Sequence, residues 1–403
     1  MEMWPGHRMR RLHDQITLRH FLTSYILTIT RCAGFRRHAY IFPPLVRLIV
    51  DHISRFGQFC GISPGRDEHD DPSYVISEQT ILRCNQGAKR RGIWMEIGID
   101  VGVYGSLATA ENITGLARFA EERNYHSIWL ADHVVFPANI ESRYPYSPTG
   151  AFPAPETDPL MEPIATMGVL AGATKNVMIG TSVLVMPYRN PLLLGRMLAT
   201  IDNFSNGRVV LGAGSGWLEE EFKALDTRDF VNRGPVTDEC LEIFKAVCGG
   251  GAVEYQGEHY QFEAMQCYPA SVQRPHPPIL IGGISNRALR RVAEHGSGWM
   301  SVSLDPDRIP ERLDRLNQLC KKNGRTLDDL WLVHKLFISI GEEQRDVGGG
   351  RKLGTGSVET VTDDIKRFQD YGYRSIIFRY PGFDADEQTR QFDLLADKIM
   401  PRV

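Results

Sequence analysis

The chain has 403 residues with 42% hydrophobic content, which is enough for one large α/β domain or two medium ones. Its formal net charge of -3 and pI near 6.5 create no field that would attract nucleic acid or an anionic membrane, so we expect neither partner. The seven cysteines include no C-x-x-C pair and no zinc-site spacing, which predicts reduced thiols in a cytoplasmic protein without a metal site. No apolar run reaches the roughly 18 residues that would indicate a membrane span.

Residues 1–94 differ from the rest of the chain. They contain 13 Arg and one Lys against eight acidic residues, together with half of the histidines, and show no sustained helix or strand periodicity. A transit peptide should lack the acidic cluster at 67–71, and a nucleic-acid-binding tail should carry more basic blocks than Lys89–Arg91. We therefore interpret Met95 as the natural start and residues 1–94 as a disordered extension from a mispredicted upstream translation start.

From Met95 onward, short β-branched runs alternate with amphipathic helical stretches, which is typical of parallel strands joined by helices. The expected strands are Ile97–Val103, Ser127–Leu130, Val177–Val185, Val209–Ala213, Pro278–Gly282, Trp299–Val302, Leu332–Ile340 and Ser375–Arg379. The expected helices lie near 110–123, 160–174, 191–204, 236–248, 286–295, 307–323, 359–371 and 386–399. Eight such units over residues 95–403 predict a closed (β/α)₈ TIM barrel rather than an open sheet.

Two insertions interrupt this alternation. The Pro-rich segment 134–159 follows the second strand, and 252–277 precedes the fifth and contains an expected hairpin that turns at Gly257. We expect both near the mouth of the barrel, where function is carried in this architecture.

Residues that could carry chemistry follow several of the strands. Asp132 and His133 come after the second strand, where a carboxylate beside an imidazole could form a proton-transfer unit or could simply be structural. After the fourth strand, the alternate glycines around Ser215 and Gly216 permit close backbone approach to a planar ligand, or form only a tight turn.

The fifth strand leads into a helix that begins near Asn286. Gly282, Gly283 and Ser285 would offer bare backbone N–H groups and a helix dipole to a phosphate, although Ser285 could act as the N-cap alone.

Five motifs in register resemble the luciferase-like monooxygenase superfamily, most closely its probable coenzyme F420-dependent oxidoreductase branch. They are MEIGI from Met95, SIWLADH from Ser127, GTSVLVMPYRNP from Gly180, DNFSNGRVVLGAGSGWLEEEF from Asp202 and PHPPILIGG from Pro275. The resemblance covers about residues 95–399.

The resemblance implies a non-prolyl cis peptide at Ser182–Val183, which props the central ring of a flavin or deazaflavin. It implies that Asp132 and His133 lie at the redox face, that Ser215 and Gly216 line the pocket, and that Gly282, Gly283 and Ser285 hold the phosphate. Trp217 stands where sugar-phosphate dehydrogenases of the superfamily have a carboxylate, so the acid would be absent or supplied by Glu219 or Glu220. This departure argues against glucose 6-phosphate and for a more apolar or aromatic substrate.

Three functions follow from these observations. The first is hydride transfer between coenzyme F420 and a small organic substrate, with His133 moving the proton and basic residues such as Arg189, Arg196 and Arg287 meeting the polyglutamate tail. The second is a two-component monooxygenase that receives reduced FMN from a flavin reductase. The third is a barrel that binds flavin without turnover. Relatives are often dimers packed through barrel helices, and we expect a homodimer.

Overall fold

The computed structural model describes residues 94–147, 149–152, 158–227, 230–346 and 349–403. Residues 1–93 lie outside the described residues, so the disordered extension and the start at Met95 stay predictions.

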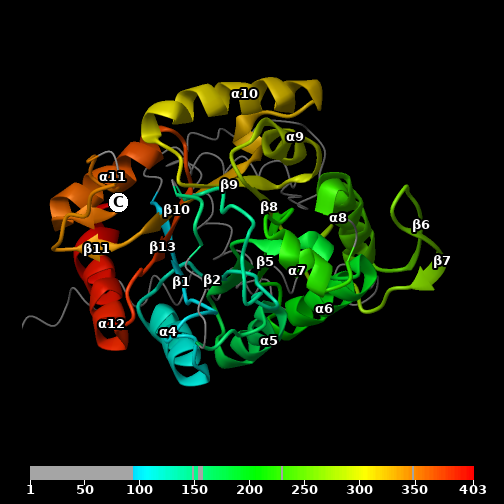
Figure 1. Ribbon diagram of the computed structural model, residues 1–403, viewed down its shortest axis with the longest axis horizontal. Coiled ribbons are helices and arrows are strands. Elements are labelled where there is room, and N and C mark those ends of the chain that lie inside the picture. The colour runs from blue at the N-terminus through cyan, green and yellow to red at the C-terminus, as the bar shows by residue number, and fades with distance from the viewer. Residues whose placement is uncertain (1–93, 148, 153–157, 228–229, 347–348) are drawn as a thin grey trace, which may run out of the picture. The chain divides into compact units, whose positions relative to one another are not determined.

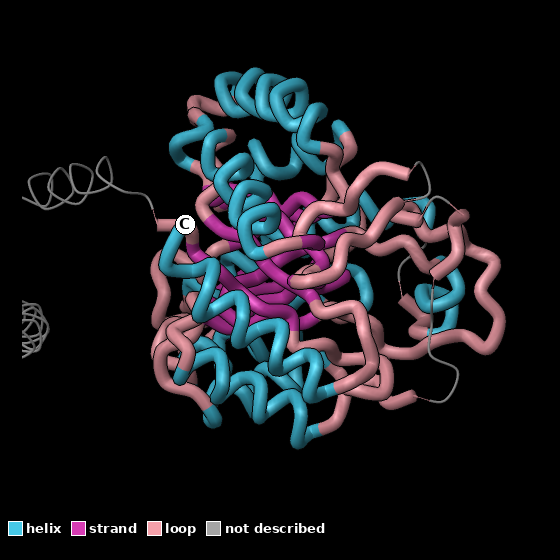
Figure 2. The backbone as a smooth tube through the Cα atoms, turned by 90° about the vertical axis from the view of Figure 1, so that its left-hand side faces the viewer, coloured by secondary structure: helices cyan, strands magenta, loops and turns pink. Residues whose placement is uncertain are grey.

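Eight parallel strands form a closed barrel in the described part of the chain (Figures 1 and 2). They are β1 (Glu96–Asp100), β2 (Ser127–Leu130), β3 (Met178–Thr181), β5 (Val209–Gly214), β8 (Ile279–Gly282), β9 (Gly298–Val302), β10 (Trp331–Phe337) and β13 (Ser375–Arg379). Pairing runs from β3 through β2, β1, β13, β10, β9 and β8 to β5, and a direct β3–β5 pairing closes the ring. The expected (β/α)₈ TIM barrel is confirmed.

Helices surround this barrel, as Figure 2 shows. They are α4 (Ala110–Glu122), α5 (Pro163–Ala173), α6 (Pro191–Phe204), α8 (Arg233–Gly249), α9 (Asn286–His295), α10 (Ile309–Lys322), α11 (Val358–Asp370) and α12 (Ala385–Leu394). Each expected helix therefore has its counterpart, and one short helix, α7 (Glu219–Ala224), lies between β5 and α8 without having been predicted.

Two of the expected strands are broken. The third strand stops at Thr181 and resumes as β4 (Leu184–Val185), with the Ser182–Val183 segment between them. The seventh strand splits into β10 and β11 (Ser339–Ile340), and β11 pairs with β12 (Thr355–Gly356) in a separate two-stranded sheet. Both breaks occur at the carboxyl end of a strand, where the backbone leaves the barrel wall to form loops.

The barrel interior is filled with side chains. Its buried members, one from each of six strands, are Trp129, Val210, Leu280, Met300, Val333 and Ile377. Glycines in the neighbouring strands make room for Trp129, because a Cβ at Gly180 would overlap the indole ring. The lower barrel is therefore a packed core, and a ligand has room only above it, at the strand ends.

The predicted hairpin is confirmed, and its place near the mouth stays a prediction. Strands β6 (Ala252–Gln256) and β7 (Gln261–Gln266) pair antiparallel between the end of α8 and the start of β8, which is the amino end of the barrel. From there the hairpin packs on the outside of the helices, where Glu239 of α8 accepts hydrogen bonds from the amides of the turn at 258–260. Glu239 lies in the amino-terminal half of α8, so the hairpin begins at the amino end of the barrel and its turn reaches back along α8 toward the mouth.

Candidate active site

The Ser182–Val183 peptide is cis, as the resemblance implied. The Val183 side chain lies over the barrel core, where Cβ atoms at Gly214 and Gly282 would come within 2.5 and 2.6 Å of it. Glycine at both positions therefore allows the segment between β3 and β4 to project across the carboxyl ends of β5 and β8. This arrangement brings three of the predicted cofactor-binding residues (Ser182, Val183 and Gly282) to one place.

Beneath this segment lies a charged cluster that sequence reasoning missed. The Nζ atom of Lys335 pairs with the Asp100 carboxylate and donates a 2.9 Å hydrogen bond to Ser182 Oγ. Burial alone would raise the pKa of Asp100, but the charges of Lys335 and Arg379 outweigh burial and hold this pKa below its ordinary value. The carboxylate is therefore ionised near neutral pH. The cluster thus fixes Ser182 and places two cations against one anion inside the barrel.

The hydrogen-bond partner of His133 is Glu221 on α7, whose Oε2 lies 2.8 Å from His133 Nδ1. Tyr188 Oη donates to the same carboxylate at 2.8 Å, and the Val134 amide donates to its other oxygen at 2.6 Å. The Glu221 side chain has no exposed surface. A carboxylate held by this many donors fixes the orientation of the imidazole and leaves Nε2 for a substrate.

Glu219 and Glu220, which the sequence suggested as a replacement acid, have other roles. Glu219 forms an exposed ion pair with Lys223. Burial raises the pKa of Glu220, but hydrogen bonds from the Ser142 hydroxyl and from nearby amides lower it to about 2. It therefore anchors the 134–159 segment as a carboxylate, and neither residue contacts His133.

Asp132 is engaged in a different interaction from the one expected. Its carboxylate is fully buried and forms a bidentate ion pair with Arg189, at 2.8 and 2.9 Å, and it accepts a hydrogen bond from the Val185 amide. The second partner of Arg189 is Glu162, at 2.6 Å. Asp132 therefore ties the end of β2 to β4, and its carboxylate bonds to Arg189 and the Val185 amide rather than to His133.

Aromatic side chains surround the His133 imidazole. Phe136 and Phe152 of the 134–159 segment have ring centroids 4.6 and 5.3 Å from it, and Trp217 and Tyr104 each lie at 6.2 Å. Tyr144 continues this wall, 5.0 Å from Trp217. The imidazole is therefore packed mostly against apolar ring surfaces.

The predicted phosphate site has the expected backbone. Gly283 adopts φ 111°, which favours glycine, and Ser285 caps α9 by accepting a hydrogen bond from the Ala288 amide at 3.2 Å. The Gly283 amide is not bare, since it donates to the Met300 carbonyl at 3.2 Å, so a phosphate at the carboxyl end of β8 would depend on the amides of the first turn of α9, and this site stays a prediction. Gly216, with φ 80°, follows Ser215 at the end of the adjacent strand β5.

Basic residues are distributed differently from the expectation. Arg189 is used by Asp132, and Arg196 donates to the carbonyl groups of Tyr268 and Pro269 on the outside of α6. Arg287 is exposed on the first turn of α9. The missed cation is Arg233 at the start of α8, which donates to the Gly216 carbonyl at 3.3 Å.

These residues fit a bound flavin or deazaflavin, because glycines at the ends of β5 and β8 let the Val183 side chain project across the barrel core as a support, and the start of α9 presents backbone N–H groups suited to a phosphate. Within the described residues, no group of three or more His, Cys, Asp or Glu side chains is arranged to hold a metal ion. No described helix is both long and apolar enough to cross a bilayer.

The luciferase-like monooxygenase family model matches residues 90–348. An uncharacterised protein of Mycobacterium tuberculosis is 28% identical over 296 residues, which is 72% of this chain and 94% of the relative. An F420-dependent glucose-6-phosphate dehydrogenase of Microbacterium testaceum is 26% identical over 70% of this chain and 90% of its own length.

Among solved structures, an F420-dependent secondary alcohol dehydrogenase in complex with an F420-acetone adduct has a TM-score of 0.61. It shares 15% sequence identity, and the match covers 77% of this chain and 98% of that one. This similarity agrees with the closed barrel. Because the family model spans more than half of the chain, the chain belongs to the luciferase-like monooxygenase family.

Proposed function

We propose that the chain is an F420-dependent oxidoreductase that transfers hydride between the deazaflavin and a small, largely apolar or aromatic organic substrate. The observation that carries this proposal is His133, whose Nδ1 is fixed by the buried Glu221 while aromatic rings surround the imidazole. The names of the Microbacterium testaceum relative and of the F420-bound alcohol dehydrogenase support the choice of cofactor.

When bound, the deazaflavin supplies or accepts the hydride. Ser182 and Val183 would support the ring, Ser215 and Gly216 would line its edge, and Gly282, Gly283 and Ser285 would hold its phosphate. His133 Nε2 gives a proton to the substrate oxygen as a carbonyl is reduced, or takes that proton as an alcohol is oxidised. Glu221 stabilises the charged imidazolium, and the aromatic wall excludes water.

Asp132, expected from sequence as a catalytic residue, is better described as a positioning residue. Its bidentate pair with Arg189 and its bond to the Val185 amide hold β4, and through β4 the Val183 segment, in place. Trp217 supports the choice of substrate class, because it presents an indole where a carboxylate would be needed to act on a sugar phosphate.

An apolar groove of about 640 Å³ between α5 and α6 supports the homodimer. It is lined by Ile164, Gly168, Met197, Ile201 and Phe204, among others. A cytoplasmic location agrees with the four described cysteines, which are buried and of which no two form a disulfide.

Titration of the purified protein with each cofactor tests the proposal. Coenzyme F420 should bind in the micromolar range and show a shifted absorption spectrum, and FMN should not bind. If FMN binds and F420 does not, the enzyme is a two-component monooxygenase that needs a flavin reductase. Binding without turnover of any alcohol, aldehyde or ketone in an aromatic panel would favour a non-catalytic flavin-binding barrel.

A further inference from the structure

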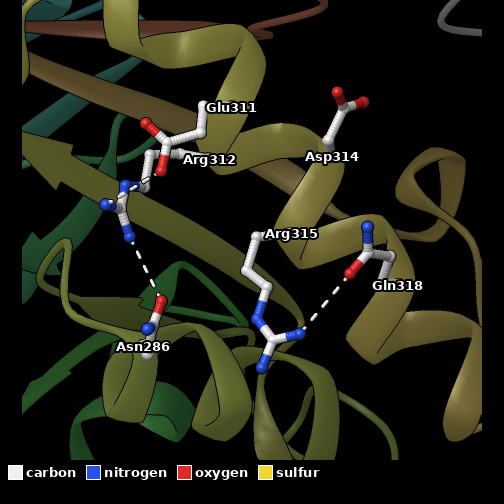
Figure 3. Close-up of a pocket in the computed structure, with 6 residues that line it drawn as sticks. All are labelled: Asn286, Glu311, Arg312, Asp314, Arg315 and Gln318. Atoms are coloured by element: carbon white, nitrogen blue, oxygen red, sulfur yellow. Dashed lines mark hydrogen bonds and ion pairs between the residues drawn. The ribbon is translucent and has the colours of Figure 1, made fainter.

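A polar cleft of about 360 Å³ lies between the first turns of α9 and α10. Asn286, Arg312 and Arg315 line it together with Glu311, Asp314 and Gln318 (Figure 3). Arg312 points toward Asn286 and donates to its side-chain oxygen at 3.2 Å. Asn286 directly follows Ser285, so the cleft begins where the predicted phosphate site ends.

Positive charge exceeds negative charge around the start of α9. Arg315 is exposed, and its partner is the neutral Gln318 amide at 3.4 Å. Arg233 and Arg287 have no carboxylate within ion-pair distance among the described residues. Burial lowers the pKa of the Arg233 guanidinium, and repulsion from the nearby Arg287 charge lowers the same pKa further. A single phosphate needs fewer guanidinium groups than this.

The two carboxylates of the cleft compensate this charge only in part. Glu311 pairs with Arg312 at 3.3 Å but is 67% exposed, so water screens the pair. The Asp314 carboxylate points away from both arginines (Figure 3). The Nε atom of Arg312 is buried without a hydrogen-bond partner in the described structure, so Glu311 and Asn286 leave one donor of this guanidinium unused.

We propose that this cleft binds the oligoglutamate tail of the deazaflavin coenzyme through Arg312 and Arg315. The inference rests on the proposed function, since a phosphate at Gly283 and Ser285 directs whatever follows it along the start of α9. FMN ends at its phosphate and would leave the cleft unused, whereas F420 continues into a chain of carboxylates that match guanidinium groups. The cleft would therefore contribute to discrimination between the two cofactors.

Binding is tested by fluorescence titration with two probes: F420 carrying several glutamates, and the same deazaflavin phosphate without glutamates. The tailed form should bind wild type more tightly, and raised salt should reduce the difference. Arg315→Gln should weaken binding of the tailed form about twofold to fivefold, and adding Arg312→Gln should bring the loss to about tenfold. Binding of the tail-free form should not change.

Two further variants act as controls. Lys322→Gln removes one charge from the far end of α10 and should have no effect, whereas Glu311→Gln frees Arg312 and should tighten binding of the tailed form only. Arg315 is exposed, so Arg315→Gln should fold normally, which thermal melting checks. Equal affinity of wild type for both deazaflavins, or unchanged binding by Arg315→Gln and the double variant, would overturn this inference and leave the proposed function intact. Binding of FMN alone would overturn both.

Discussion

Glu221 and His133 are 88 residues apart in the chain, and their Oε2 and Nδ1 atoms are 2.8 Å apart at the mouth of the barrel. In sequence, the 134–159 segment lies between β2 and α7. The pair therefore joins the end of β2 to α7 across that segment. Since Glu221 also accepts hydrogen bonds from Tyr188 and the Val134 amide, it holds the imidazole and the start of that segment as one unit.

Glu221→Gln should therefore reduce turnover without weakening cofactor binding. Glutamine keeps an acceptor for His133 but loses the charge that stabilises the imidazolium, so we expect kcat to fall about tenfold to a hundredfold. His133→Ala should lower it at least as much. Steady-state kinetics with F420 and fluorescence titration separate the two effects, and Glu219→Gln, on the exposed face of α7, is the control. Unchanged turnover in Glu221→Gln would remove the pair from the mechanism.

Asp132→Asn should act on stability first. It leaves the Arg189 guanidinium buried beside a neutral amide, and removal of one member of a buried pair costs about 3–5 kcal/mol. Urea denaturation measures the free energy of unfolding. Glu162→Gln removes the other, 38% exposed partner of Arg189 and should cost about 1 kcal/mol or less. Equal losses in the two variants would show that Asp132 is not the structural anchor of β4.

The barrel was predictable from sequence because its signals are local. Each strand is a short β-branched run such as Ser375–Arg379, and each helix has its own periodicity. His133 and the glycines at β5 and β8 were found for the same reason, since a residue after a strand must lie at the mouth.

Contacts between distant segments were not predictable in this way. Three consecutive glutamates follow Trp217, and only the fold shows that Glu221 is the one that faces inward, next to the buried Phe222. Arg189 seemed free for an anionic ligand because its partner Asp132 is 57 residues away. The path of the hairpin is a contact of the same kind, because only the fold shows that its turn reaches back to Glu239 on α8.

Gly282→Ala should destabilise the site through Val183. The new Cβ would lie 2.6 Å from Val183 Cγ1, and overpacking of this kind costs about 1–3 kcal/mol. Val183→Ala removes the obstructing methyl groups, so the double variant should recover part of that loss. Thermal melts of the two single variants and the double variant form the cycle. Strictly additive losses would mean that the two side chains do not meet.

Phe204→Glu should convert the expected dimer into a monomer. Phe204 is 77% exposed at the end of the apolar groove between α5 and α6. A glutamate carboxylate at this position would lose its hydration in a packed interface without gaining a partner, which opposes association. Sedimentation equilibrium gives the mass. Phe383→Glu alters a phenylalanine that is 78% exposed elsewhere and should leave the dimer intact. A wild-type monomer, or a dimeric Phe204→Glu variant, would exclude this interface.

His334 should make the fold sensitive to mild acid. Its ring is fully buried against Phe368, with Nδ1 2.7 Å from Ser301 Oγ, and burial lowers its pKa from 6.5 to about 3. Below pH 6.5 the unfolded chain binds a proton at this position that the folded chain cannot bind until about pH 3. The free energy of unfolding should therefore fall as the pH drops through this range, by about 2 kcal/mol between pH 7 and pH 5 from this residue.

His334→Gln isolates that contribution, because glutamine can keep a hydrogen bond to Ser301 but does not titrate. Urea denaturation of both proteins at a series of pH values should give a shallower acid slope for the variant, while the other titrating groups contribute equally to both curves. At pH 7 the variant should have a lower free energy of unfolding than the wild type. At pH 5 this difference should be smaller, because only the wild type has a buried imidazole that must stay unprotonated to fold. Parallel curves would show that the imidazole takes up a proton in the folded protein as readily as in the unfolded chain, so that burial beside Ser301 and Phe368 does not keep it neutral.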